Sequence, residues 1–207
     1  MQAFNTAKDY ILENDIVLLR PLVESDYENL LAFAINEPDT WKYSLVSASG
    51  ADGMRKYIDT ALEQRAKGLE YAFIVFDKRT NQYAGSTRFY DIQLQNQMMQ
   101  LGYTWYGSKF RGTGLNKNCK LLLLQFAFDT LGMERIEFRA SNDNERSKAA
   151  MRSIGCVEEG VLRSHAATFT GTRRSSIVLS ILKNEWDGGV KERLVEKLMG
   201  VESRKGK

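Results

Sequence analysis

A glycine-containing segment, Tyr103–Lys117, joins a strand-like aromatic run to an apolar run long enough to form a buried helix. Gly112 and Gly114 let backbone N–H groups turn inward with no Cβ in the way. The first turn of the following helix adds unpaired N–H groups and the positive end of its dipole. Arg111 and Lys117 add positive charge. The segment therefore predicts a phosphate or pyrophosphate site, and a glycine turn without a ligand is the alternative.

The common nucleotide motifs fit this segment poorly. A P-loop requires a lysine directly after its second glycine, and Thr113 stands at that position. The Rossmann fingerprint matches Gly112 and Gly114 but has Lys117 in place of its third glycine. Neither nucleotide class is favoured, so a second segment has to identify the ligand.

Two motifs that follow one another along the chain indicate which ligand this segment binds. Arg111–Asn116 resembles the pyrophosphate loop, Q/R-x-x-G-x-G/A, of the GCN5-related N-acetyltransferase (GNAT) superfamily. About thirty residues later, Asn144-x-x-Ser147 opens a segment that is similar to the next motif of that superfamily. Together with Glu159-Gly160 it resembles the RimJ/RimL branch, the ribosomal-protein-alanine acetyltransferases. Two further segments, near the ends of 14–187, also resemble this branch: Val17–Pro21 and Ser180–Trp186.

The resemblance implies an α/β (α+β) fold with one GNAT-like domain over 14–187, an N-terminal extension over 1–13, and a C-terminal helix and tail over 188–207. The implied sheet is mixed and mostly antiparallel, has about seven strands, is splayed between the fourth and fifth strands, and is flanked by helices. Acetyl-CoA is the implied cosubstrate, and no metal is expected. The residues implied to bind it are Thr104, Trp105, Tyr106, Arg111, Gly112, Thr113, Gly114, Leu115, Asn116, Lys117, Asn144 and Ser147.

The implied reaction is direct attack of a neutral amine on the thioester. It needs donors for the oxyanion, a base for the amine proton and a donor for the departing thiolate. Many superfamily members use a tyrosine for the last role, where this chain has Met151. The related branch implies Ser147 as the thiolate-side donor, with Asn144 as a contact of pantetheine or its amide. The alternative for Ser147 is a hydroxyl that bonds its own backbone in the first turn of a helix.

The base is less well defined by the sequence. The resemblance implies a glutamate that is common at the position of Gln100, and one that some RimL-like enzymes use at the position of Ala166; neither of the side chains found here accepts a proton at neutral pH. The remaining candidates are Asp91, Glu37, Asp39 and the single histidine, His165, which as a lone histidine is more often structural. Because the expected acid and base residues are replaced, a second interpretation stays open: a non-catalytic acyl-CoA-binding sensor or scaffold of the same fold.

Two loops outside the cofactor motifs are expected to face the acceptor, Glu37–Tyr43 and His165–Arg173. The acidic residues of the first loop suit a cationic amine, whether a protein N-terminus, a polyamine or an aminoglycoside. Trp41 either stacks on the ligand or staples the loop to the core. The expected substrate-binding residues are Glu37, Asp39, Trp41 and Asp91.

Hydrophobic periodicity predicts the elements that position these residues. Strands are expected over 16–21, 71–76, 83–92, 99–105, 135–139, 157–163 and 175–181. Helices are expected over 25–34, 53–67, 115–131, 145–153 and 190–199. Ser25 is predicted to cap the first helix, with Glu28 at the capping-box position.

Composition agrees with one globular domain: of 207 residues, 43% are hydrophobic and 27% are charged. The net charge of +3 is too small to predict a nucleic-acid partner. No apolar run predicts a signal peptide or a membrane helix. Cys119 and Cys156, with one histidine, fit neither a disulfide framework nor a zinc site. We expect a cytoplasmic enzyme that meets acetyl-CoA and an amine, without a membrane or nucleic-acid partner, and a homodimer stays open.

Overall fold

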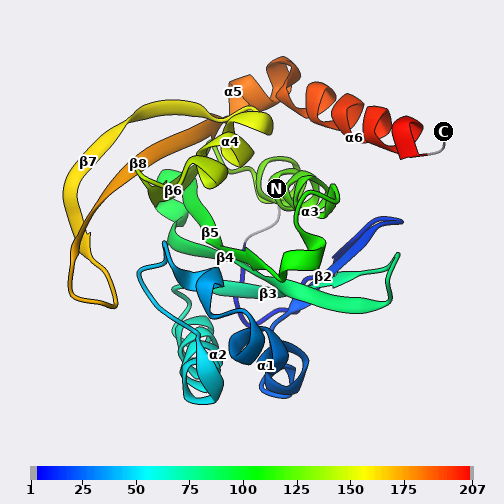
Figure 1. Ribbon diagram of the computed structural model, residues 1–207. Helices are drawn as coiled ribbons and strands as arrows, with labels where there is room; N and C mark the ends of the chain where they lie inside the picture. Colours follow the sequence, from blue (N-terminus) through cyan, green and yellow to red (C-terminus); the bar gives the residue numbers. More distant parts are fainter. Residues whose placement is uncertain (1–3, 206–207) are drawn as a thin grey trace.

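An eight-stranded sheet in the order β1-β2-β3-β4-β5-β6-β8-β7 forms the centre of the computed structural model, which describes residues 4–205 (Figure 1). Neighbouring strands are antiparallel except β5 and β6, which are parallel. The mixed, mostly antiparallel sheet is therefore confirmed. The strands are β1 (Leu12–Glu13), β2 (Val17–Pro21), β3 (Tyr71–Asp77), β4 (Gln82–Gln93), β5 (Met98–Tyr106), β6 (Arg135–Ser141), β7 (Val157–Ala167) and β8 (Arg173–Leu182). The strand beyond the expected seven is β1, whose two residues are too few to show a periodic pattern.

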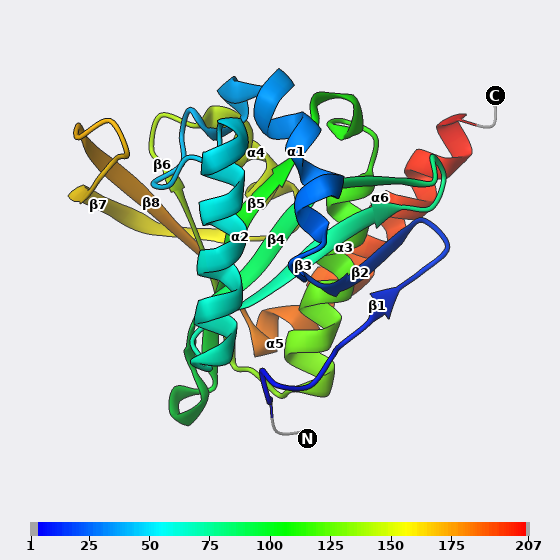
Figure 2. The ribbon, with the colours of Figure 1, turned by 90° about the horizontal axis from the view of Figure 1, so that it is seen from below.

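Helices cover both faces of the sheet. Figures 1 and 2 show α1 and α2 on one face and α3 and α6 on the other. The helices are α1 (Asp26–Asn36), α2 (Gly50–Ala66), α3 (Leu115–Gln125), α4 (Glu145–Ser153), α5 (Lys183–Glu185) and α6 (Lys191–Lys205). A π-helical turn, Phe126–Thr130, continues α3, and 3₁₀ turns lie at Pro38–Trp41, Leu94–Asn96 and Ser108–Phe110.

Each face of the sheet has its own hydrophobic core, because successive side chains of a strand point to opposite faces. Tyr71, Phe73 and Val75 of β3 pack in the core beneath α3, whereas Ala72 and Ile74 pack in the core beneath α1 and α2. All five side chains are almost completely buried. The continuous apolar run of β3 is thus explained by burial on both faces.

The start of α1 differs from the expected capping box. Ser25 makes no side-chain cap bond, and its backbone is already helical at φ −64° and ψ −12°. A capping side chain usually requires an extended backbone at that position. Asp26 takes over: its Oδ2 accepts from Val23 N at 3.0 Å, and Arg20 donates to both of its oxygens at 2.6 and 2.8 Å. The capping prediction for Ser25 is therefore wrong.

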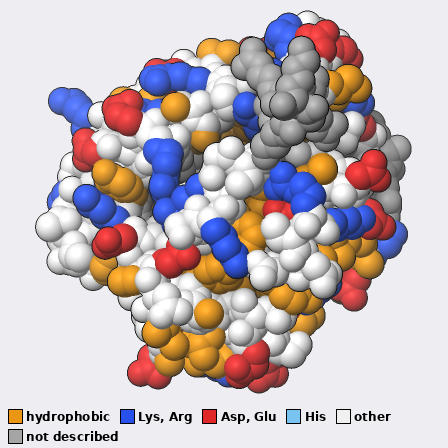
Figure 3. Space-filling model, turned by 45° about the vertical axis from the view of Figure 1, so that its right-hand side comes forward, with side chains coloured by type: hydrophobic (Ala, Val, Ile, Leu, Met, Phe, Trp, Pro, Cys, Tyr) orange, Lys and Arg blue, Asp and Glu red, His pale blue; other side chains and the backbone are white. Residues whose placement is uncertain are grey.

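The segments that flank the expected domain pack against it. Phe4 and Tyr10 lie in the same core as Tyr71, and Leu194 of α6 is 1% exposed in that core. The boundaries at 14 and 187 remain a prediction. Within residues 4–205, no helix combines the length and apolarity that crossing a bilayer would require. On the face shown in Figure 3, basic and acidic side chains are interspersed.

The feature that positions the site is the separation of β5 and β6. These strands pair only from Met98 opposite Arg135 to Gln100 opposite Glu137. Beyond Gln100, β5 keeps its pairing with β4, while β6 keeps its pairing with β8 as far as Ser141. The sheet therefore opens into a wedge, which confirms the expected splay; β1 shifts the strand numbers by one.

Candidate active site

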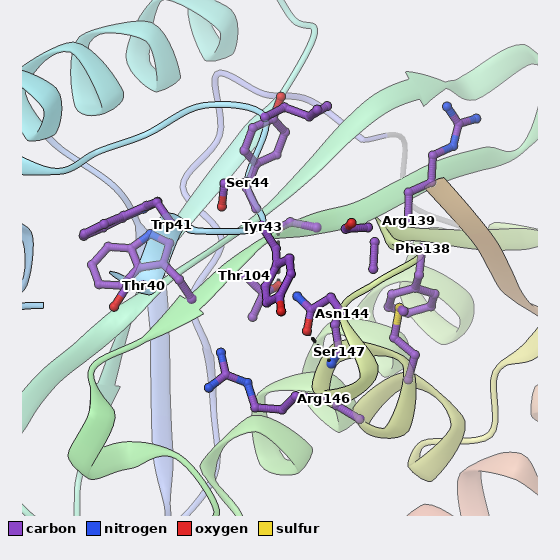
Figure 4. Close-up of a pocket in the computed structure, with 18 of the residues that line it drawn as sticks. Thr40, Trp41, Tyr43, Ser44, Thr104, Phe138, Arg139, Asn144, Arg146 and Ser147 are labelled. Carbon is purple, nitrogen blue, oxygen red and sulfur yellow. Dashed lines mark hydrogen bonds between the residues drawn. The ribbon is translucent and has the colours of Figure 1, made fainter. Parts of the chain in front are cut away.

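A cavity of about 1030 Å³ occupies the wedge between β5 and β6. Its walls are formed by these strands, the N-terminal ends of α3 and α4, the segment 39–46, and parts of β4, β7 and β8. In Figure 4, Thr104, Phe138, Asn144 and Ser147 surround one common space. The wedge thus brings together residues that lie far apart in the sequence.

Most of the residues singled out in the sequence line this cavity. They are Asp39, Trp41, Asp91, Thr104, Trp105, Tyr106, Arg111, Gly112, Asn116, Asn144 and Ser147. Within the described part of the chain, Glu37, Thr113, Gly114, Leu115 and Lys117 do not belong to the lining. Leu115 is instead buried in the core, as expected for an apolar residue on the inner face of α3.

The glycine loop has the backbone conformation that its sequence predicts. Gly112 and Gly114 adopt left-handed φ angles of 73° and 87°, and Gly114 is the N-cap of α3. The loop is held from within, since Thr113 Oγ1 donates to Phe110 O at 2.8 Å, and from outside, since Arg79 Nη1 donates to Thr113 O at 3.0 Å. A helix N-terminus held behind two glycines is suited to binding an anion.

Arg111 organises the loop. Its Nε donates to Tyr106 O and its Nη2 donates to Thr40 Oγ1, both at 2.9 Å. Burial and the positive charge of Arg146 lower the pKa of Arg111. The mouth of the loop is therefore an electropositive region in which a phosphate group would be favoured.

Glu37 connects two loops through its carboxylate. Its Oε2 accepts from Ser108 N at 2.7 Å and its Oε1 accepts from Ser108 Oγ at 3.1 Å. Its Oε2 also lies 3.9 Å from Arg111 Nη2. With both oxygens engaged, Glu37 positions the glycine loop from the side.

The β5 segment offers its backbone to the cavity. Trp105 and Tyr106 are buried in opposite cores, and Trp41 packs on Trp105 at 5.3 Å between ring centroids. Trp41 is 2% exposed, which fits the alternative that it staples its loop to the core. Beyond Gln100 no strand of residues 4–205 pairs with the β6-facing edge of β5, and such an edge can pair with an extended ligand.

Asn144 and Ser147 lie at the start of α4. Asn144 Oδ1 accepts from Ser147 N at 3.1 Å and so caps the helix (Figure 4). Ser147 Oγ has no hydrogen-bond partner in the described part of the chain, so the expected alternative of a backbone-bonded hydroxyl is not seen. The hydroxyl lines the cavity and is available to a ligand.

The opposite end of the cavity carries mixed charges. Asp91 Oδ2 accepts from Gln100 Nε2 at 2.7 Å, so the glutamine positions a neighbouring carboxylate. His165 is largely exposed, yet its partial burial and the positive charges of Arg139, Arg174 and Arg173 lower its pKa. These surroundings therefore favour the neutral form of His165.

Sequence reasoning missed Lys120 as a cavity residue. Its side chain lines the cavity, yet the residue is only 4% exposed. The available signal was its position four residues after Asn116, which places both on one face of α3.

Comparison with known proteins identifies the family. The sequence-family model of the acetyltransferase (GNAT) domain matches residues 17–157. The chain is 26% identical over 181 residues to YdaF of Bacillus subtilis, which is named provisionally as a ribosomal N-acetyltransferase; the match covers 84% of this chain and 96% of YdaF. The chain therefore belongs to the GNAT family of N-acetyltransferases, whose members use acetyl-CoA, and the RimJ/RimL resemblance agrees with this relative.

Solved structures share the fold. A GCN5-related N-acetyltransferase from Brucella melitensis superposes with a TM-score of 0.84 at 24% identity, over 92% of this chain and 86% of that one. The Microcin C7 self-immunity acetyltransferase MccE, solved with acetyl-CoA and AMP, superposes with a TM-score of 0.72 at 22% identity, over 82% of this chain and 93% of that one.

Proposed function

We propose that this chain transfers the acetyl group of acetyl-CoA directly to a primary amine. The observation that carries the proposal is the cavity between β5 and β6, which ends on the glycine loop at the start of α3. An open strand edge beside a helix N-terminus suits a ligand with an extended amide-bearing chain and a pyrophosphate group.

The residues in and beside the cavity divide into roles along that ligand. The pyrophosphate lies on the backbone of 111–117, with Arg111 and Lys117 as neighbouring charges. Pantetheine pairs with the free edge of β5 from Thr104 to Tyr106. Asn144 and Ser147 lie near the thioester, where the Ser147 hydroxyl donates to the departing sulfur. This order follows the cavity from the α3 end towards the β7 and β8 end.

The acceptor amine approaches from the side of Asp39, Trp41 and Asp91. Lys42, Arg139 and Arg174 line the same cavity, so its acceptor end has no excess of negative charge. That balance favours a protein N-terminus, which carries a single positive charge, over a polycation such as a polyamine.

Replacement of Gly114 by valine tests the cofactor site. The left-handed φ of 87° disfavours a β-branched side chain, and the added methyl groups would stand where the pyrophosphate approaches. We expect the dissociation constant for CoA to rise at least tenfold, about 1.4 kcal/mol. The measurement is calorimetric titration with CoA, with ATP and NAD as competing ligands.

Gly68→Val is the matched control, because Gly68 also has a left-handed φ, 75°, but follows the end of α2, whereas Gly114 is the N-cap of α3. Unchanged CoA affinity in folded Gly114→Val protein, or tighter binding of ATP or NAD, would contradict the proposal. Release of free thiol with a panel of amines separates an enzyme from a non-catalytic acyl-CoA-binding protein, the second function that Met151 and Gln100 keep open.

A further inference from the structure

Lys120 is a buried amine inside the proposed acetyl-CoA site. The residue lies on α3 and is 4% exposed, and its Nζ donates to Thr104 Oγ1 at 2.9 Å. Nζ also lies 5.6 Å from the centre of the Phe138 ring. Thr104 belongs to β5 and Phe138 to β6, so the ammonium group lies between the two strands where they separate. Lys120, Thr104 and Phe138 all line the cavity.

Among the described residues, no carboxylate neutralises this lysine. Within residues 4–205, Thr104 is its hydrogen-bond partner and no ion pair involves it. The titratable groups that face it are the thiols of Cys119 on α3 and Cys156 before β7, whereas β5 and β6 present Thr104 and Phe138, which do not ionise. A buried cation without a counterion is costly, so the site lacks one negative charge.

A second buried lysine shows the usual arrangement. Lys148 on α4 is 8% exposed, and its Nζ pairs with Glu145 Oε1 at 2.5 Å. Lys148 does not belong to the cavity lining. The contrast indicates that the missing partner of Lys120 comes from a ligand.

We propose that Lys120 is a catalytic residue whose ammonium group binds and then protonates the sulfur of the departing CoA. The proposal rests on the proposed acetyl transfer. The amine nitrogen attacks the thioester carbon, the C–S bond breaks, and its electron pair goes to sulfur. Lys120 Nζ gives one proton to that sulfur and later regains one from solvent, which receives the proton released by the attacking amine. The products are the acetylated amine and CoA with a free thiol.

The acidity of Lys120 agrees with this role. Burial lowers the pKa of Lys120 to about 8, close to the value of about 8.5 for a free thiol, so the proton passes between them with little change in free energy. Ser147 Oγ complements the lysine, because a neutral hydroxyl contributes a hydrogen bond to the sulfur but no charge. Met151, at the position where many family members have a tyrosine that acts as the acid, provides neither a hydrogen bond nor a charge.

The pKa of the bound CoA thiol tests the proposal without an acceptor. Thiolate absorbs in the ultraviolet, so the titration of CoA bound to the full chain is read directly. We expect the thiol pKa in the wild-type complex to lie at least about one unit, a tenfold change in the ionisation constant, below the free value of about 8.5, and to return to that value or above it in Lys120→Met. Burial raises the pKa of Cys119 and of Cys156 to about 12, so neither contributes in this range.

Lys148→Met is the matched control, since it removes a buried lysine outside the cavity and should leave the bound-thiol pKa unchanged. If Lys120→Met does not fold, Thr104→Val provides a second test. It should also raise the bound-thiol pKa, but by a smaller amount, because it removes the hydrogen bond that holds Lys120 Nζ in place. Equal thiol pKa values in wild type and Lys120→Met would overturn the role of Lys120 alone. A chain that binds no CoA would overturn the proposed function as well, and acetylation of Lys120 on incubation with acetyl-CoA would identify it as an acceptor and not as the acid.

Discussion

Asn144 and Ser147 lie one helical turn apart, and the structure separates their tasks. Asn144 Oδ1 caps α4 by accepting from Ser147 N, and this leaves Ser147 Oγ free at the cavity wall. Ser147→Ala should therefore lower kcat by about ten- to a hundredfold and change the KM for acetyl-CoA less, because help to a good leaving group is limited. Steady-state kinetics with varied acetyl-CoA provides the measurement.

Asn144→Ala makes a useful comparison at the same scale. Loss of the cap should destabilise the fold by about 1 kcal/mol, which chemical unfolding detects, whereas Ser147→Ala should not affect unfolding. If Ser147→Ala changes only the KM for acetyl-CoA, the hydroxyl binds the cofactor and takes no part in the departure of the thiol.

At the scale of the elements, the contact between β4 and β5 decides where the pantetheine edge lies. Gly85 of β4 is opposite Tyr106, and a Cβ at Gly85 would lie 2.0 Å from Trp105 O. Gly85→Ala must push β5 away from β4. We expect a loss of about 2–3 kcal/mol in the free energy of unfolding, as for other overpacked sites, and weaker binding of CoA. Urea unfolding and CoA titration measure the two effects.

Gly160→Ala isolates the steric contribution. Gly160 has the same φ of 154°, but a Cβ there would meet nothing within 4 Å. Gly160→Ala should therefore lower the free energy of unfolding only through the unfavourable backbone conformation, because no steric clash is added. Equal losses for Gly85→Ala and Gly160→Ala would show that the close approach of β4 and β5 does not matter.

For the whole molecule, Lys120 links the site to the stability of the fold. Its pKa falls from about 10.4 in an unfolded chain to about 8 in the folded protein. Between these values the unfolded chain binds more protons, so stability contributed by this group rises with pH over this window, and below pH 8 the full penalty of the buried cation applies. Lys120→Met should stabilise the protein at pH 7 by on the order of 1–3 kcal/mol.

Thermal unfolding of wild type and Lys120→Met at pH 7 and pH 10 provides the measurement. The difference in stability should shrink as the pH rises, because above pH 8 the lysine of the folded wild-type protein loses its proton and the cost of burying a cation disappears. A difference that is independent of pH would mean that packing, and not charge, distinguishes the two proteins. A site that lowers stability in this way is typical of catalytic groups held ready for a ligand.

Local chemistry explains how much of this protein could be predicted from its sequence. The helix expected over 145–153 is observed as α4, Glu145–Ser153, because its cap and its periodicity lie within a few residues. Gly112 and Gly114 likewise adopt the left-handed angles that their turn requires. The sheet class, the splay and the glycine loop follow from motifs whose meaning is local or comes from the family they resemble.

Contacts between distant segments could not be predicted in this way. Glu37 accepts a hydrogen bond from Ser108, which is 71 residues away, and its local sequence does not indicate this contact. Lys120 looked like one polar residue in an apolar helix until α3 was placed against the separating strands, where Nζ meets Thr104. Sequence alone determined which residues could bind phosphate and turn the chain. Tertiary structure alone decided which polar groups lose water and a partner, because desolvation depends on every element that closes around a side chain.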